Sequence, residues 1–156
     1  MGHRLMRGGD MFAQAAALAQ AGDTARDTHG QEMLRKYGRS GARQEAEAGL
    51  PLVRAAYQQI VAGKDDLCSI LLSIISQCSD TNVLYRGGPE ALQVVQQRAA
   101  SILNKPLFTR KALIQRLDKA MIERDLSPGG SADILAAALF LYKSRLAWQE
   151  ADSETE

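Results

Sequence analysis

The sequence predicts an all-α protein, a single multi-helix domain of six to eight helices with no sheet. Apolar residues recur at helical spacing in several segments, and glycines and prolines separate these segments. No segment shows the sustained apolar–polar alternation of a half-buried strand. A length of 156 residues suits one domain with its own core, and apolar and charged fractions of 46% and 24% are ordinary for a globular protein.

The first part of the chain predicts three short helices. Apolar residues within 11–19 form a helical face that stops at Gly22. Thr28 and Gln31 have the spacing of a capping box, so a helix is expected from there to Tyr37, before Gly38. A turn or two of helix should follow over residues 43–48.

The central helices are predicted from their first residues. Pro51 suits the first position of a helix that carries Val53, Ala56 and Tyr57 on one face. Asp65 and Asp66 suit the positive end of the next helix, whose apolar residues cover more than one face, so that helix should be central and mostly buried.

The last three helices are expected to follow tight turns. Residues 86–90 should form a turn before a Pro-started helix that ends near Leu103. Thr109 and Ser131 are the predicted caps of the two helices after it, and the last should run to about Trp148. By these boundaries residues 1–8 are an added or disordered leader, residues 9–149 the helical domain and residues 150–156 a polar tail.

Charge and apolar patterning exclude two classes of partner. Nineteen Lys and Arg stand against 18 Asp and Glu, and this balance does not favour bulk nucleic-acid binding, although a local anion site remains open. The apolar stretches are too short to span a bilayer and no signal-peptide pattern is seen, so we expect a cytoplasmic protein without a membrane partner. Cys68 and Cys78 are expected to be buried thiols in a reducing compartment.

Two polar segments could bind phosphate, since each combines glycines with the start of a helix. The first spans residues 80–88 and the second residues 127–133. Helix N-termini offer backbone N–H groups and partial positive charge, and glycine lets a phosphate approach the backbone. We predict that the two segments converge on a shared pocket. The predicted phosphate-binding residues are Arg86, Gly87, Gly88, Gly129, Gly130 and Ser131. The alternative is that both segments are only turns.

Carboxylates near these turns could hold Mg²⁺. Asp80 and Asp133 are the predicted ligands, because Mg²⁺ usually reaches a protein through one or two carboxylates and substrate phosphates. Asp133 could instead complement a helix dipole. A third segment places Arg43 and Glu45 close together, either as a site pair or as a solvated helix start. His29 could face a ligand or make a structural hydrogen bond.

These segments together resemble the C-terminal half of the triphosphoribosyl-dephospho-CoA synthase family. The resemblance runs from about residue 28 to 142, and the Ser-Pro-Gly-Gly-Ser-Ala-Asp stretch at 127–133 is its most specific element, followed by Arg-Gly-Gly at 86–88. The other matching stretches are Thr28–Gly30, Tyr37–Gly38, Gly41–Ala46, Gly49–Pro51 and Asp80–Asn82. Gln44 and Leu50 depart from the family pattern. Full members also carry an N-terminal half, so we expect a fragment, a split-gene product or a shortened homologue.

The resemblance implies a transferase that uses ATP and dephospho-CoA. The 2′-hydroxyl of dephospho-CoA would displace adenine from the ribose of ATP, yielding the precursor of a prosthetic group of citrate lyase or malonate decarboxylase. Glu45 or Asp80 would act as the base, and Asp80 and Asp133 would bind Mg²⁺. His29 and Arg43 would join the phosphate-binding residues in contacting substrate. The alternatives are a nucleotide- or CoA-binding module without activity and a helical interaction domain. A second chain or a homo-oligomer could complete the fold.

Overall fold

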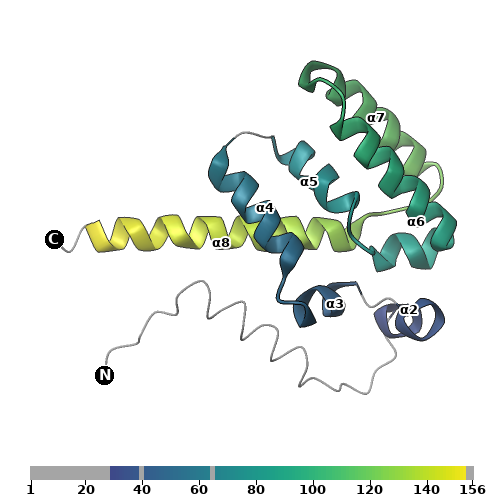
Figure 1. Ribbon diagram of the computed structural model, residues 1–156, viewed down its shortest axis with the longest axis horizontal. Helices are drawn as coiled ribbons and strands as arrows, with labels where there is room; N and C mark the ends of the chain where they lie inside the picture. The colour runs from purple at the N-terminus through teal and green to yellow at the C-terminus, as the bar shows by residue number, and fades with distance from the viewer. Residues whose placement is uncertain (1–28, 39–40, 64–65, 154–156) are drawn as a thin grey trace.

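Glycines, prolines and acidic caps mark the ends of most helices in the computed structural model, which describes residues 29–38, 41–63 and 66–153 (Figure 1). These ranges form seven helices and no strand, which confirms the all-α prediction. The helices are α2 (His29–Tyr37), α3 (Ala42–Glu47), α4 (Pro51–Ala62), α5 (Leu67–Ile75), α6 (Thr81–Leu103), α7 (Leu107–Ile122) and α8 (Gly129–Ser153). The helix predicted over residues 11–19 and the Thr28 cap lie outside the described residues.

Several helix ends confirm the sequence prediction. Gly38 follows α2 with a φ of 68°, a conformation that costs glycine little. Pro51 is the first residue of α4. The Asp66 carboxylate caps α5 by accepting hydrogen bonds from the Ser69 backbone N–H (2.9 Å) and the Ser69 hydroxyl (3.0 Å).

Two predicted caps were wrong, because their helices begin three residues earlier than these caps imply. α7 starts after Pro106, and the Thr109 hydroxyl donates to the Pro106 carbonyl (2.8 Å) inside the first turn. α8 starts at Gly129, so Ser131 also lies inside the first turn and its hydroxyl donates to Asp80. Both hydroxyls act as donors, whereas a cap would accept from a backbone N–H. α8 also extends to Ser153, past the predicted end near Trp148.

The turn predicted at residues 86–90 is a break inside α6. Gly88 has φ 73° and ψ −178°, and the helical geometry resumes at Pro89 and continues to Leu103. Residues 81–87 are therefore a short helix of their own, and not the loop that the sequence predicted. Glycine tolerates the positive φ, and proline suits the first position of the second helical segment.

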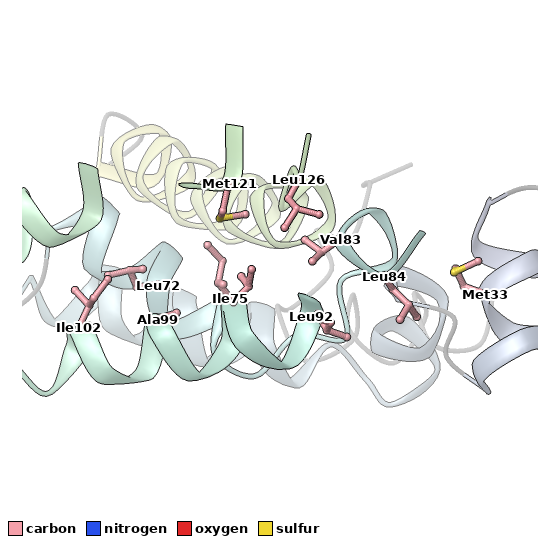
Figure 2. Packing of buried hydrophobic residues seen from close by; sticks show 11 residues of the cluster. Met33, Leu72, Ile75, Val83, Leu84, Leu92, Ala99, Ile102, Met121 and Leu126 are labelled. Carbon is pink, nitrogen blue, oxygen red and sulfur yellow. The ribbon is translucent and has the colours of Figure 1, made fainter. Parts of the chain in front are cut away.

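Two apolar clusters make up the core, and α5 belongs to both. The first lies between α5, α6 and α7, with Met33 of α2 packed at one end near Leu84 (Figure 2). The second lies between α4, α5 and α8, where α4 crosses α8 (Figure 1). The second cluster contains Val53, Ala56, Ile70, Ile74, Cys78, Ile134 and Ala138. The mostly buried central helix predicted for residues 67–75 is thereby confirmed.

The two cysteines differ in their exposure to solvent. Cys78 is buried, as predicted, but Cys68 is exposed, because it sits in the first turn of α5 beyond the apolar clusters. In the part of the chain that the structure describes, no helix is both long and apolar enough to cross a membrane.

Candidate functional site

The first turns of α6 and α8 meet at one buried carboxylate, that of Asp80. Its Oδ1 caps α6 by accepting from the backbone N–H groups of Asn82 (3.0 Å) and Val83 (3.4 Å). Its Oδ2 accepts from the backbone N–H (2.8 Å) and the hydroxyl (2.9 Å) of Ser131. The two segments expected to converge therefore lie together, although Ser131 follows Asp80 by 51 residues.

Asp80 is fully engaged in this arrangement. Only 3% of its surface is exposed, and Ser131 is completely buried. An ionised carboxylate offers about four acceptor positions, and four donors occupy them here. To act as a base or a metal ligand, Asp80 would first have to release some of these donors.

Three of the predicted glycines, Gly87, Gly129 and Gly130, have close neighbours, whereas a Cβ on Gly88 would meet no other atom. A Cβ on Gly129 would stand 2.5 Å from Nδ2 of Asn82, and a Cβ on Gly130 would stand 3.4 Å from the Asp80 carboxyl carbon. A Cβ on Gly87 would stand 2.5 Å from Cβ of Ala91 and 2.7 Å from a methyl group of Leu126. The contact with Ala91 therefore favours glycine at Gly87, whereas at Gly129 the neighbour is the end of the Asn82 side chain, which can shift.

Arg86 bridges α6 and the loop that precedes α8. Its Nη1 donates to Oδ1 (2.6 Å) and to the backbone carbonyl (3.1 Å) of Asp125. The two side chains are 44% and 88% exposed, so solvent screens the ion pair and it contributes little to stability. Asp125 has a φ of 53°, which is unusual for a residue with a side chain. Arg86 is thus held at the surface by a pair that an incoming anion could displace.

Glu45 holds a helix terminus as well. Its Oε1 accepts from the backbone N–H groups of Leu52 (2.5 Å) and Val53 (3.2 Å), in the first turn of α4. The residue before this helix, Leu50, cannot cap with its side chain, and a glutamate from α3 takes over that role. Like Asp80, Glu45 is buried and would have to leave backbone donors in order to act as a base.

The carboxylates of Asp80 and Asp133 are not brought together. Ser131 faces Asp80, and Asp133 lies two residues further along α8, about 200° around a helix axis. Asp133 is accordingly exposed. Among the described residues no group of three His, Cys, Asp or Glu side chains could hold a metal ion. The donor set therefore does not fit a preformed magnesium site between these two residues.

Cys78 lies beside the two buried carboxylates. Burial raises the pKa of its thiol to about 11, and the neighbouring charges of Asp80 and Glu45 act in the same direction. This thiol is therefore protonated and unreactive at neutral pH. The start of α3 lies against the start of α6, where a Cβ on Gly41 would stand 2.8 Å from the Thr81 methyl group, so Glu45 of α3 lies near the same polar centre.

Some site residues were missed by the sequence reading, and two could not be placed. Asn82 contacts the start of α8, and Asp125 accepts from Arg86. The Asp-Thr-Asn stretch at 80–82 pointed to Asn82, but no pattern in the sequence pointed to Asp125. The backbones of His29 and Arg43 lie in α2 and α3, but their side chains are outside the described part of the structure.

Comparison with known proteins identifies the family. Residues 2–152 match the family model CitG, described as ATP:dephospho-CoA triphosphoribosyl transferase. A probable 2-(5''-triphosphoribosyl)-3'-dephosphocoenzyme-A synthase of Pseudomonas putida is 36% identical over 148 residues, 86% of this chain and 53% of that protein. The synthase of Pectobacterium atrosepticum is 44% identical over 123 residues, 74% of this chain and 40% of that protein.

The chain spans about half the length of the curated relatives it matches. No solved structure matches it. The family model covers nearly the whole chain, and the relatives carry the same name. The chain therefore belongs to the ATP:dephospho-CoA triphosphoribosyl transferase family.

Proposed function

We propose that this chain takes part in transferring the triphosphoribosyl group of ATP to the 2′-hydroxyl of dephospho-CoA, with release of adenine. The product would be the precursor of the prosthetic group of citrate lyase or malonate decarboxylase. Because the chain covers about half of its relatives, a second chain or a second copy is proposed to complete the enzyme. The substrates follow from the family description.

The observation that carries the proposal is the junction of α6 and α8 at Asp80. Two helix N-termini lie together there, and Arg86 lies near the other end of the short helix 81–87 that begins at this junction. Asp80 already occupies N–H groups of both helix starts, so a triphosphate that must be held without being cleaved would be attracted by Arg86 and by the amides that Asp80 leaves free. The helix break at Gly88, where a Cβ would meet no other atom, lies close to Arg86 in the chain.

The proposed roles follow from exposure and hydrogen bonding. Arg86 would bind phosphate after exchanging Asp125 for it, together with the amides of residues 87–88, 129 and 130, whereas the buried Ser131 amide already donates to Asp80. His29 and Arg43 are proposed to contact substrate. The transfer builds positive charge on the ribose, and a carboxylate would take the proton of the attacking hydroxyl. Glu45 and Asp80 are the proposed bases, and either would have to release its helix cap first.

Magnesium is proposed to accompany ATP and not to be resident. Mg²⁺ keeps several waters and commonly binds through substrate phosphates and one or two carboxylates. Asp133 is exposed near the start of α8 and could supply one carboxylate, whereas both oxygens of Asp80 already accept hydrogen bonds. No step of the reaction is assigned to the metal.

An adenine-release assay tests the proposed function. The chain is incubated with ATP, Mg²⁺ and dephospho-CoA, alone and with the N-terminal half of a relative, while calorimetry measures ATP binding. Adenine release that depends on dephospho-CoA supports the proposal, and Arg86→Ala should weaken ATP binding about tenfold or more, the loss expected for one charged hydrogen bond. Lys119→Ala, which removes a positive charge at an exposed position of α7, is the matched control. ATP binding without adenine release under both conditions would favour a binding module instead.

A further inference from the structure

We propose that the groove between α5 and α7 binds the uncharged pantetheine arm of a CoA-type nucleotide whose phosphates lie outside the groove, beyond its Asp125 end. The inference rests on the proposed function and adds a location for the second substrate. The groove encloses a cavity of about 410 Å³, within the usual range of small-molecule sites.

Two helix faces give the cavity an elongated shape. α5 contributes Cys68, Leu71, Leu72 and Ile75, and α7 contributes Ile114, Asp118, Met121 and Ile122. Both sets follow helical spacing, so each is a stripe along one face. At 1.5 Å per residue, the α5 stripe is about 10 Å long. A stripe of that length suits an extended chain better than a compact ring.

One end of the groove adjoins Arg86 and the other end is at Cys68. Asp125, Ser127 and Pro128 line the end that follows α7, and Asp125 is the residue that holds the Arg86 guanidinium. At the opposite end, Arg110 near the start of α7 donates to Ser69 near the start of α5 (3.1 Å). A ligand whose phosphates lie beyond the Asp125 end can therefore extend along the groove toward Cys68.

The acidic side chains that line the cavity favour the uncharged part of the ligand over its phosphates. The charged residues of this cavity, Asp118 and Asp125, are both acidic, so a phosphate inside it would be repelled. Pantetheine carries no charge and has two amide groups, which can donate to those carboxylates. Its methyl and methylene groups would contact the leucine, isoleucine and methionine side chains of the groove.

Alkylation of Cys68 tests where the arm lies. Cys68 is exposed and should react with N-ethylmaleimide, whereas Cys78 is buried with a protonated thiol and serves as an internal control. S-methyl dephospho-CoA is the ligand, because its blocked thiol consumes no reagent. At ten times its dissociation constant it should slow Cys68 alkylation about tenfold, since about one tenth of the sites remain free. ADP, which lacks the arm, should bind without slowing alkylation, and Cys68→Ser should remove the signal.

A rim variant gives a second readout. Ile122 is 68% exposed at the edge of the cavity, so Ile122→Trp should fill the groove without disturbing the core. We expect it to raise the dissociation constant of S-methyl dephospho-CoA about tenfold and to leave that of ATP unchanged. Val94→Trp, on an exposed position of α6 outside the cavity, is the matched control.

The outcomes separate this inference from the proposed function. If adenine is released but neither alkylation nor the Ile122→Trp affinity responds to the arm, the groove assignment is overturned and the proposed function stands. Equal protection by ADP also overturns it. Protection that rises with protein concentration in the absence of ligand would assign the groove to a second copy instead. If neither ATP binding nor adenine release is found, both proposals fail together.

Discussion

Replacing Asp80 by asparagine separates a structural role of this residue from a catalytic one. The carboxylate accepts four hydrogen bonds, two from the first turn of α6 and two from Ser131. An asparagine has a single acceptor oxygen, and its NH₂ group can only donate. If that oxygen stays on α6, the Ser131 hydroxyl can turn to accept from the amide, but the Ser131 backbone N–H loses its acceptor in a fully buried position.

The cost can be estimated from these contacts. A buried N–H without a partner costs about 1–3 kcal/mol, and hydrogen bonds to a charged acceptor are each about 1 kcal/mol stronger than neutral ones. The sum is about 3 kcal/mol in the free energy of unfolding, or a fall of roughly 6–12 °C in Tm for a domain of this size. Ser131→Ala removes only the hydroxyl bond and should cost about half as much.

Thermal and urea unfolding followed by circular dichroism at 222 nm measure these changes, with adenine release assayed on the same samples. Ser101→Ala, at an exposed position of α6, is the control and should change stability by less than about 0.5 kcal/mol. An Asp80→Asn protein as stable as the parent would refute the structural reasoning. If it also lost activity, the predicted base or metal role would gain instead.

Four further perturbations have defined outcomes. Gly87→Ala should destabilise the fold by about 1–3 kcal/mol, since its Cβ would meet Ala91 at 2.5 Å; adding Ala91→Gly should restore part of this, and urea midpoints that do not differ would contradict the packing argument. Glu45→Gln should lower the free energy of unfolding in urea by about 1–2 kcal/mol, because the amide oxygen is a weaker cap for α4, and Glu123→Gln, at an exposed position, is its control. The pKa of Asp66 lies below its ordinary value, chiefly because its carboxylate accepts from the Ser69 N–H, so its stabilisation is present above the unfolded pKa of 3.8 and is lost as pH falls through the lower folded value. Asp66→Asn should therefore be the less stable protein at pH 7 by a few tenths of a kcal/mol, with the difference shrinking toward pH 3, and a constant difference would refute the charge effect. Asp125→Asn should tighten ATP binding several-fold by freeing Arg86, and calorimetry showing weaker binding would contradict the exchange of Asp125 for phosphate.

Helix positions could be predicted from the sequence because the breaks are local. The helix starts at Pro51 and after Asp66, and the break at Gly88–Pro89, depend on local backbone geometry or on a neighbour three residues away. The local sequence is therefore sufficient to predict them. Ser131 was misplaced for the opposite reason. Its hydroxyl bonds to a residue 51 positions earlier, and no local rule anticipates that partner.

The candidate site shows the same division. The convergence of the segments around Asp80 and Ser131 was expected, but the use of Asp80 and Glu45 as helix caps was not. A buried carboxylate that caps a helix cannot be told from one that binds a metal by its residue type or by the residues next to it in the sequence. Only the positions of the backbone donors distinguish the two, and these depend on how α3, α4, α6 and α8 pack.

The nine residues of α5 join the two halves of the interior, because Leu72 and Ile75 face one apolar cluster while Ile70 and Ile74 face the other. The α4–α8 pair cannot separate from the α6–α7 pair without exposing at least one apolar face of this short segment to water. Amide hydrogen exchange in α5 should accordingly be among the slowest in the chain and should require global opening. A mutation that loosens either cluster would then be felt in the other, so the chain should melt as one cooperative unit.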